Sequence, residues 1–84
     1  MSEQIVPPGK KAVGSKETLK AIEKGLASQV FIAKNAEKRV ILPLIEACQQ
    51  NQIPITEVET MDELGKACKI TVKAAAAAQL KGNS

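Results

Sequence analysis

The feature that most restricts the fold of this chain is an alternation of short apolar runs with segments of helical periodicity. Residues 29–33 and 53–58 are runs rich in β-branched side chains, which is typical of buried strands. Between them, residues 37–50 carry apolar side chains at helical spacing. This order predicts an α/β fold, a three-layer α/β/α sandwich around a small mixed sheet. With 84 residues the chain has room for one domain.

Three shorter elements complete the expected pattern. Residues 10–13 fit a short strand, and residues 16–24 and 61–68 fit helices. Gly25 is a natural stop for the first helix. The apolar stripe of this first helix is formed by three residues at helical spacing, namely Leu19, Ile22 and Leu26. The proline-containing residues 1–9 are expected to be a flexible lead-in, with a single domain over residues 10–84.

Two stretches leave alternatives open. Pro43 either kinks one helix over residues 37–50 or lies in the first turn of a helix that starts near Leu42. The run Ala74–Ala78 has high helix propensity, but small side chains also suit a closing strand packed tightly between helices. Both cases need information beyond local preference.

Composition removes several functional classes. The chain has no His and no C-x-x-C motif, so it offers no metal site and no histidine general base, and we expect no enzyme and no cofactor. Phe31 is its only aromatic residue, which argues against RNA readers that stack bases on aromatic side chains. Cys48 and Cys68 are expected to be reduced core thiols. No apolar run approaches membrane-spanning length, so we expect a cytoplasmic protein.

The segment Gly14–Lys20 carries the main functional signal. Ser15 is expected to cap a helix start whose free amides and dipole favour an anion. Lys16 and Lys20 are four residues apart and add positive charge on one side. Glu17 supplies a carboxylate that can accept the paired N–H donors of a guanine edge. Taken alone, the segment favours a plain helix cap with a solvated lysine face over a binding site.

A second cluster, Leu64–Cys68, is preceded by a loop that contains Thr60 and Met61. Met61 is expected to be exposed, where a thioether can pack against an extruded base or a sugar. Lys66 and Lys69 can extend a basic surface, consistent with the net charge of +3. As an alternative, Met61 marks only the start of the following helix.

Three blocks in this order carry a family resemblance: Gly14–Lys20, Ala33–Glu37 and Leu64–Cys68. Together they resemble the kink-turn-binding ribosomal proteins, the L-seven-Ae / L-thirty-e family, in its short bacterial YbxF-like form. The resemblance covers about residues 11–80. It implies a four-stranded sheet in which the alanine run is the last strand. It also implies binding to RNA kink-turns, which are bulged helices followed by tandem sheared G·A pairs.

The resemblance also assigns roles to individual residues. Gly14 and Ser15 approach the RNA backbone, and Lys16 stands where many members have Asn. Glu17 corresponds to a glutamate that accepts from guanine N1 and N2, and Lys20 to a lysine that contacts base and phosphate. The remaining implied contacts are Glu37, Thr60 and Met61, the last two in the loop that receives an extruded nucleotide. Lys69 replaces a glycine common in the family.

The sequence therefore favours a monomeric protein that binds structured RNA, in ribosomal RNA or a riboswitch. One rival is a protein-interaction module with the same fold that has lost specific RNA reading. Another is a redox protein with a Cys48–Cys68 couple, for which the chain offers only Lys66 as an activating base.

Overall fold

The computed structural model describes residues 10–68 and 73–81, and it contains four strands and three helices. The elements follow one another along the chain as β1 (Lys11–Val13), α1 (Ser15–Glu23), β2 (Ala27–Ala33), α2 (Lys38–Gln50), β3 (Ile55–Val58), α3 (Met61–Ala67) and β4 (Ala76–Leu80). Each of these elements matches one that the sequence predicts.

The strands form one sheet in the order β1-β4-β2-β3. β2 and β3 are parallel, whereas β4 runs antiparallel to both β1 and β2 between them. β1, β2 and β3 therefore all point the same way, and each is followed by a helix. The carboxyl ends of these three strands consequently lie at one end of the sheet.

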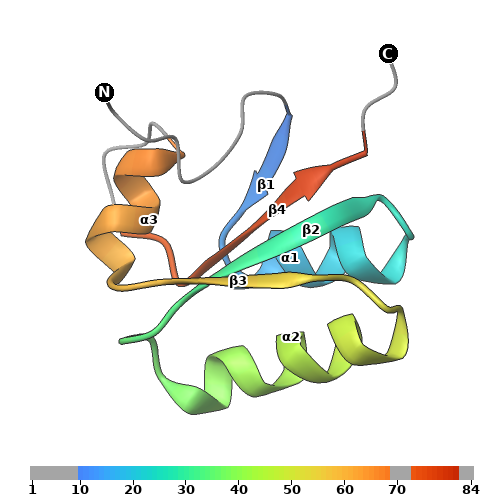
Figure 1. Ribbon diagram of the computed structural model, residues 1–84, viewed down its shortest axis with the longest axis horizontal. Helices are drawn as coiled ribbons and strands as arrows, with labels where there is room; N and C mark the ends of the chain where they lie inside the picture. The colour runs from blue at the N-terminus through green and yellow to red at the C-terminus, as the bar shows by residue number, and fades with distance from the viewer. Residues whose placement is uncertain (1–9, 69–72, 82–84) are drawn as a thin grey trace.

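The helices form layers on both faces of this sheet, as Figure 1 shows for α1 and α2 against α3. Side chains alternate along β2, so that Val30 and Ile32 pack in one core cluster with α1 and α2. Phe31 and Ala33 pack in the other cluster, with Leu64 of α3. The three-layer α/β/α sandwich around a mixed four-stranded sheet is confirmed.

Ala76–Ala78 of the alanine run begin β4, one of the two inner strands of the sheet. Ala76, Ala77 and Ala78 have no exposed surface, because β4 has strands on both sides and core packing on both faces. Methyl side chains leave room for α1 and β2 to approach closely. Tertiary packing has therefore overridden the high helix propensity of alanine, in favour of the strand that the family resemblance implied.

Of the two alternatives for Pro43, the structure has the single helix: Pro43 lies inside a continuous α2 that begins at Lys38, and no helix starts near Leu42. Two other expectations about local structure are wrong. Leu26 follows the end of α1, and it is 48% exposed and outside the core stripe. Ser15 is the first residue of α1 rather than its cap. Gly25, with φ +73°, ends the helix as expected. The lead-in 1–9 and Lys69 lie outside the described residues.

Candidate nucleic-acid interface

The candidate site residues follow the three strands that point the same way. Gly14–Lys20 come directly after β1, Glu37 follows β2, and Thr60 and Met61 follow β3. In Figure 1, β2 and β3 end on the side of the molecule where α2 and α3 begin. Segments that are far apart in sequence are thus brought to one end of the sheet.

The β1–α1 junction depends on the backbone of Gly14. Its φ of 103° and ψ of 153° lie in a region that is essentially restricted to glycine. The Gly14 amide donates to the Ala76 carbonyl at 2.8 Å, and the Gly14 carbonyl accepts from the Thr18 amide at 2.9 Å. No side chain caps the helix, so the first amides of α1 are not occupied by a capping group. Ser15 was predicted to take that role and does not.

Residues 16–20 of α1 present charged side chains outward. Lys16, Glu17 and Lys20 are exposed, whereas Thr18, Ala21 and Ile22 face the core. Within residues 10–68 and 73–81, the ion pairs are Lys34 with Glu59 and Arg39 with Glu37. Lys16, Glu17 and Lys20 therefore make no ion pair there. Their charges are available to a ligand, and one of them is negative.

The β2–α2 junction places Glu37 at the start of α2, where it precedes the first helical residue. Its Oε1 accepts from Arg39 Nε at 2.9 Å, and both side chains are largely exposed. An exposed pair of this kind contributes at most about 1 kcal/mol to folding stability. Glu37 can therefore exchange Arg39 for another donor at small cost.

The β3–α3 junction is built differently from the prediction for Met61. Thr60 caps α3, and its hydroxyl accepts from the Glu63 amide at 3.0 Å. Met61 is the first residue of α3, half-buried and packed against the α3-side core, not exposed in a loop. Its amide donates to Asn35 Oδ1 at 2.8 Å. The start of α3 at Thr60 and Met61 is thus held by its own cap and by the β2–α2 turn.

The start of β4 ties all three junctions together through the backbone. Gly14 N donates to Ala76 O, Ala33 N donates to Ala75 O at 3.0 Å, and Ala74 N donates to Met61 O at 3.2 Å. Three consecutive alanines therefore hold one junction each. This arrangement, and the bond from Asn35, were not found by sequence reasoning. The only sequence signal for Asn35 was its turn-forming residue type directly after a strand.

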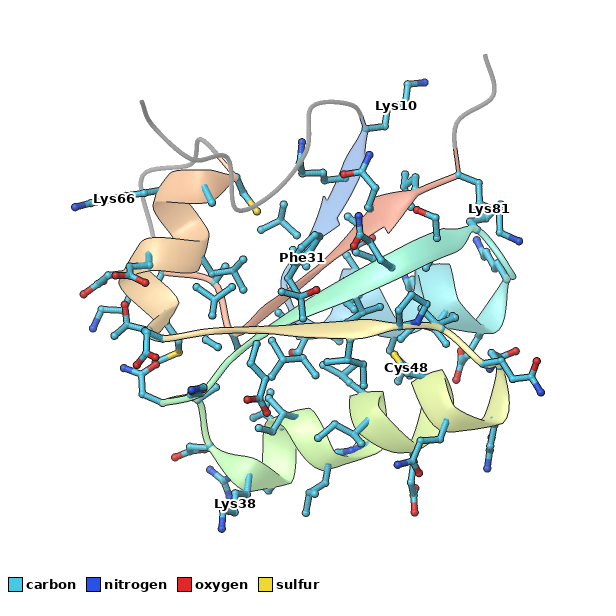
Figure 2. All side chains as sticks on the ribbon, in the orientation of Figure 1. Lys10, Phe31, Lys38, Cys48, Lys66 and Lys81 are labelled. Atoms are coloured by element: carbon cyan, nitrogen blue, oxygen red, sulfur yellow. The ribbon has the colours of Figure 1, made fainter. Side chains whose placement is uncertain are left out.

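The two thiols do not form a couple. Cys48 is buried among α1, α2 and the sheet, whereas Cys68 packs in the α3-side cluster, and both are free. Figure 2 shows Cys48 between the sheet and α2. Burial raises the pKa of both thiols, and Lys11 partly opposes this for Cys68. Both stay protonated at neutral pH, which disfavours thiolate chemistry.

Other classes of site find little support in the geometry. A groove of about 590 Å³ lies between β3 and α2, but it is lined by Ile32, Ile41, Ile45 and Ile55 with Lys34 and Glu57. It contains none of the predicted site residues. Among the described residues, no group of three His, Cys, Asp or Glu side chains is placed to hold a metal, and no helix is long and apolar enough to cross a membrane.

Residues 3–84 match the ribosomal protein L7Ae/L30e/S12e/Gadd45 family. The chain belongs to this family. An RNA-binding protein of Caldanaerobacter subterraneus subsp. tengcongensis is 46% identical to it over 82 residues, covering 98% of both chains. The RNA-binding protein YbxF of Geobacillus stearothermophilus is 39% identical over 79 residues, which is 94% of this chain and 96% of YbxF. The resemblance predicted from the three sequence blocks is confirmed.

Solved structures support the same family fold. The 15.5kD RNA binding protein of Giardia lamblia superimposes with a TM-score of 0.81 and 30% identity, over 87% of this chain. This chain spans 62% of the length of that structure. A Bacillus halodurans protein of unknown function, 21% identical, has a TM-score of 0.77 and shows the same fold.

Proposed function

We propose that this L7Ae-family chain is an RNA-binding protein that recognises kink-turns with tandem sheared G·A pairs and stabilises their kinked form. The proposal is carried by one observation. Among the described residues, the carboxylate of Glu17 and the flanking Lys16 and Lys20 make no ion pair, and they lie at a helix start without a side-chain cap. RNA binding by the two relatives and by the Giardia structure, as their names state it, supports the same function.

The presence of Glu17 is what distinguishes base reading from phosphate binding. A site for phosphate alone gains from the helix dipole and from the lysines, and a carboxylate there opposes the ligand. Guanine N1–H and N2–H are paired donors that a carboxylate can accept. In a sheared G·A pair adenine N7 accepts only one of the two N2 hydrogens, so guanine N1–H and the other N2–H stay free, whereas in a Watson–Crick G·C pair the cytosine uses N1–H and N2–H. Glu17 therefore favours sheared pairs.

The lack of exposed aromatic side chains agrees with this target. The single aromatic residue, Phe31, is 1% exposed, so it offers no stacking platform. The major groove of regular A-form RNA is too narrow for side chains, and a sharp kink opens it at the sheared pairs. The N-terminal end of α1 can then reach base edges, while lysines contact phosphates and supply most of the affinity.

Stabilisation of the kink follows from differential binding. A protein that contacts the kinked form and not the extended form shifts the population toward the kinked form by the difference in binding free energy. Glu37, Thr60 and Met61 add contacts at the neighbouring junctions in this proposal. We further propose that the protein acts as a monomer in the cytoplasm, on ribosomal RNA or another structured RNA.

The decisive experiment compares two RNA hairpins in a gel-shift titration. One contains tandem sheared G·A pairs, and in the other these are replaced by Watson–Crick pairs. We expect tight binding of the first only, together with closure of its two arms measured by fluorescence energy transfer. Equal affinity for both hairpins would contradict the proposal and favour the interaction-module alternative.

The role of Glu17 is tested by the substitution Glu17→Gln. Loss of the paired acceptor is expected to weaken binding of the kink-turn by about 1–3 kcal/mol, the range for a bidentate base contact. Glu23→Gln is the matched control, because it changes the same charge on the same helix, at the last residue of α1. Both variants should keep a native circular dichroism spectrum. Unchanged affinity of a folded Glu17→Gln variant would remove Glu17 from the site.

A further inference from the structure

The backbone of Met61 is held by hydrogen bonds on both sides. Its amide donates to Asn35 Oδ1 at 2.8 Å, and its carbonyl accepts from the Ala74 amide at 3.2 Å. The second bond is between backbone groups, and a substitution does not remove it directly. The first depends on one side chain, 26 residues away in the sequence. We call these two hydrogen bonds the Met61 clamp. Only the bond to the Asn35 side chain can be removed by a substitution.

We propose that Asn35 is a positioning residue for the RNA site: it fixes the backbone of Met61 so that Thr60 and Met61, at the start of α3, meet the extruded nucleotide of a kink-turn in a set geometry. The proposal rests on the proposed function. It assigns no RNA contact to Asn35 itself. These hydrogen bonds order the Thr60–Met61 segment before RNA binds, so the protein loses less conformational entropy on binding.

The surroundings of Asn35 make it a rigid support. It lies in the turn after β2, closed by the Ala36 amide donating to the Ala33 carbonyl at 3.2 Å. The Lys34 amide donates to the Val58 carbonyl at 2.7 Å, which fastens this turn to the end of β3. The Asn35 side chain therefore projects from a turn that is itself held to the strand preceding the Thr60–Met61 segment.

The hydrogen bond to Asn35 also gives the Met61 amide a partner that α3 itself does not provide. The first amides of an α-helix have no partner within the helix. In α3 the Thr60 hydroxyl accepts a hydrogen bond from the Glu63 amide, and the Asn35 side chain accepts one from the Met61 amide. Without Asn35 the Met61 amide must bond to water, and α3, with seven residues, has little helical stability of its own to hold the Thr60–Met61 segment.

The variants are chosen to separate the acceptor from the side chain. Asn35→Ala removes the acceptor, and Asn35→Asp keeps a carboxylate oxygen at its position. Asn51→Ala is the matched control: its side-chain amide donates to the Ala47 carbonyl at 2.8 Å, also exposed, at the far end of α2. It therefore loses a comparable bond away from the site.

Each variant is titrated against two kink-turn RNAs, one intact and one with the extruded nucleotide made abasic. For Asn35→Ala we expect affinity for the intact RNA to fall about three- to tenfold, as for loss of one hydrogen bond, and affinity for the abasic RNA to change less than about twofold. Asn35→Asp should restore the wild-type ratio between the two RNAs, because any repulsion of phosphate by its charge acts on both. Asn51→Ala should leave the ratio unchanged.

A measurement on the free protein tests the clamp without RNA. Amide hydrogen exchange at Met61 should become faster in Asn35→Ala, and stay near the wild-type rate in Asn35→Asp and Asn51→Ala. An unchanged Met61 exchange rate in Asn35→Ala overturns the proposal, as does an equal loss of affinity for both RNAs. A wild-type protein that fails to prefer sheared G·A pairs contradicts the proposed function instead, and no Asn35 variant enters that comparison.

Discussion

Neighbouring residues of α1 serve opposite purposes within one turn. Glu17 and Lys20 are exposed and unpaired among the described residues, while Thr18 between them has no exposed surface. The helical rotation of about 100° per residue places the exposed residues of the proposed RNA site and the core residues on different sides of the same nine-residue helix. Changes on one side should therefore leave the other nearly untouched.

Thr18 gives a test of this separation. Its Oγ1 is buried and makes no hydrogen bond with the described part of the protein. Burial of an unbonded hydroxyl costs free energy that a methyl group of similar size does not. We expect Thr18→Val to raise the free energy of unfolding by about 1 kcal/mol, measured by urea denaturation, and to leave RNA affinity unchanged.

The control for this substitution is Thr56→Val on β3, where the side chain is exposed. It should shift the unfolding free energy by no more than about 0.5 kcal/mol. A Thr18→Val variant that is less stable than wild type would show that the hydroxyl has a partner in solution.

At the scale of elements, α2 contains a residue that opposes its own helix. Pro43 lies inside Lys38–Gln50 and is exposed. It has no amide hydrogen to donate to the carbonyl of Arg39, four residues earlier, and its ring crowds that carbonyl. The apolar face of α2, with Leu44 and Cys48 buried, keeps the helix continuous in spite of this cost.

The substitution Pro43→Ala should therefore stabilise the protein. Proline costs about 3 kcal/mol relative to alanine inside a helix, and its rigidity in the unfolded chain offsets about 1 kcal/mol of this. We expect the free energy of unfolding to rise by about 1–2 kcal/mol, with a higher melting temperature by calorimetry. Glu46→Ala, at an exposed position of the same helix, should change little. No gain from Pro43→Ala would mean that α2 has absorbed the proline without loss.

Local sequence patterns were enough to predict every described element except β4. These patterns did not decide the features that depend on tertiary packing. Pro43 could not be placed by local preference, since the packing of Leu44 and Cys48 decides it. The strand state of Ala76–Leu80 came from the family resemblance, and its cause is the sheet on both sides of β4. The Asn35–Met61 bond joins residues 26 apart, and no pattern in the sequence predicts it.

At the scale of the whole molecule, cations are present at both ends of the sheet. Figure 2 shows Lys38 and Lys66 near the βα junctions and Lys10 and Lys81 at the opposite end. β4 runs antiparallel to β1 and β2, so Lys81, directly after it, lies away from the three junctions. A net charge of +3 alone would attract RNA to either end. The proposed site requires binding at one end only.

Salt dependence can separate these two cases. Each phosphate neutralised by a lysine releases counterions, so log K falls with log salt concentration in proportion to the number of phosphate contacts.

Lys20→Gln and Lys81→Gln both lower the net charge by one, but only Lys20 lies at the proposed site. We expect Lys20→Gln to reduce the magnitude of the slope by about one and to weaken binding, while Lys81→Gln leaves the slope nearly unchanged. Glu17→Gln should lower affinity for the kink-turn without reducing the slope, because the proposed partner of Glu17 is a base and not a phosphate. Equal effects of the two lysine substitutions would mean that RNA follows the overall charge of the molecule, and the specific contacts at the βα junctions would lose their support.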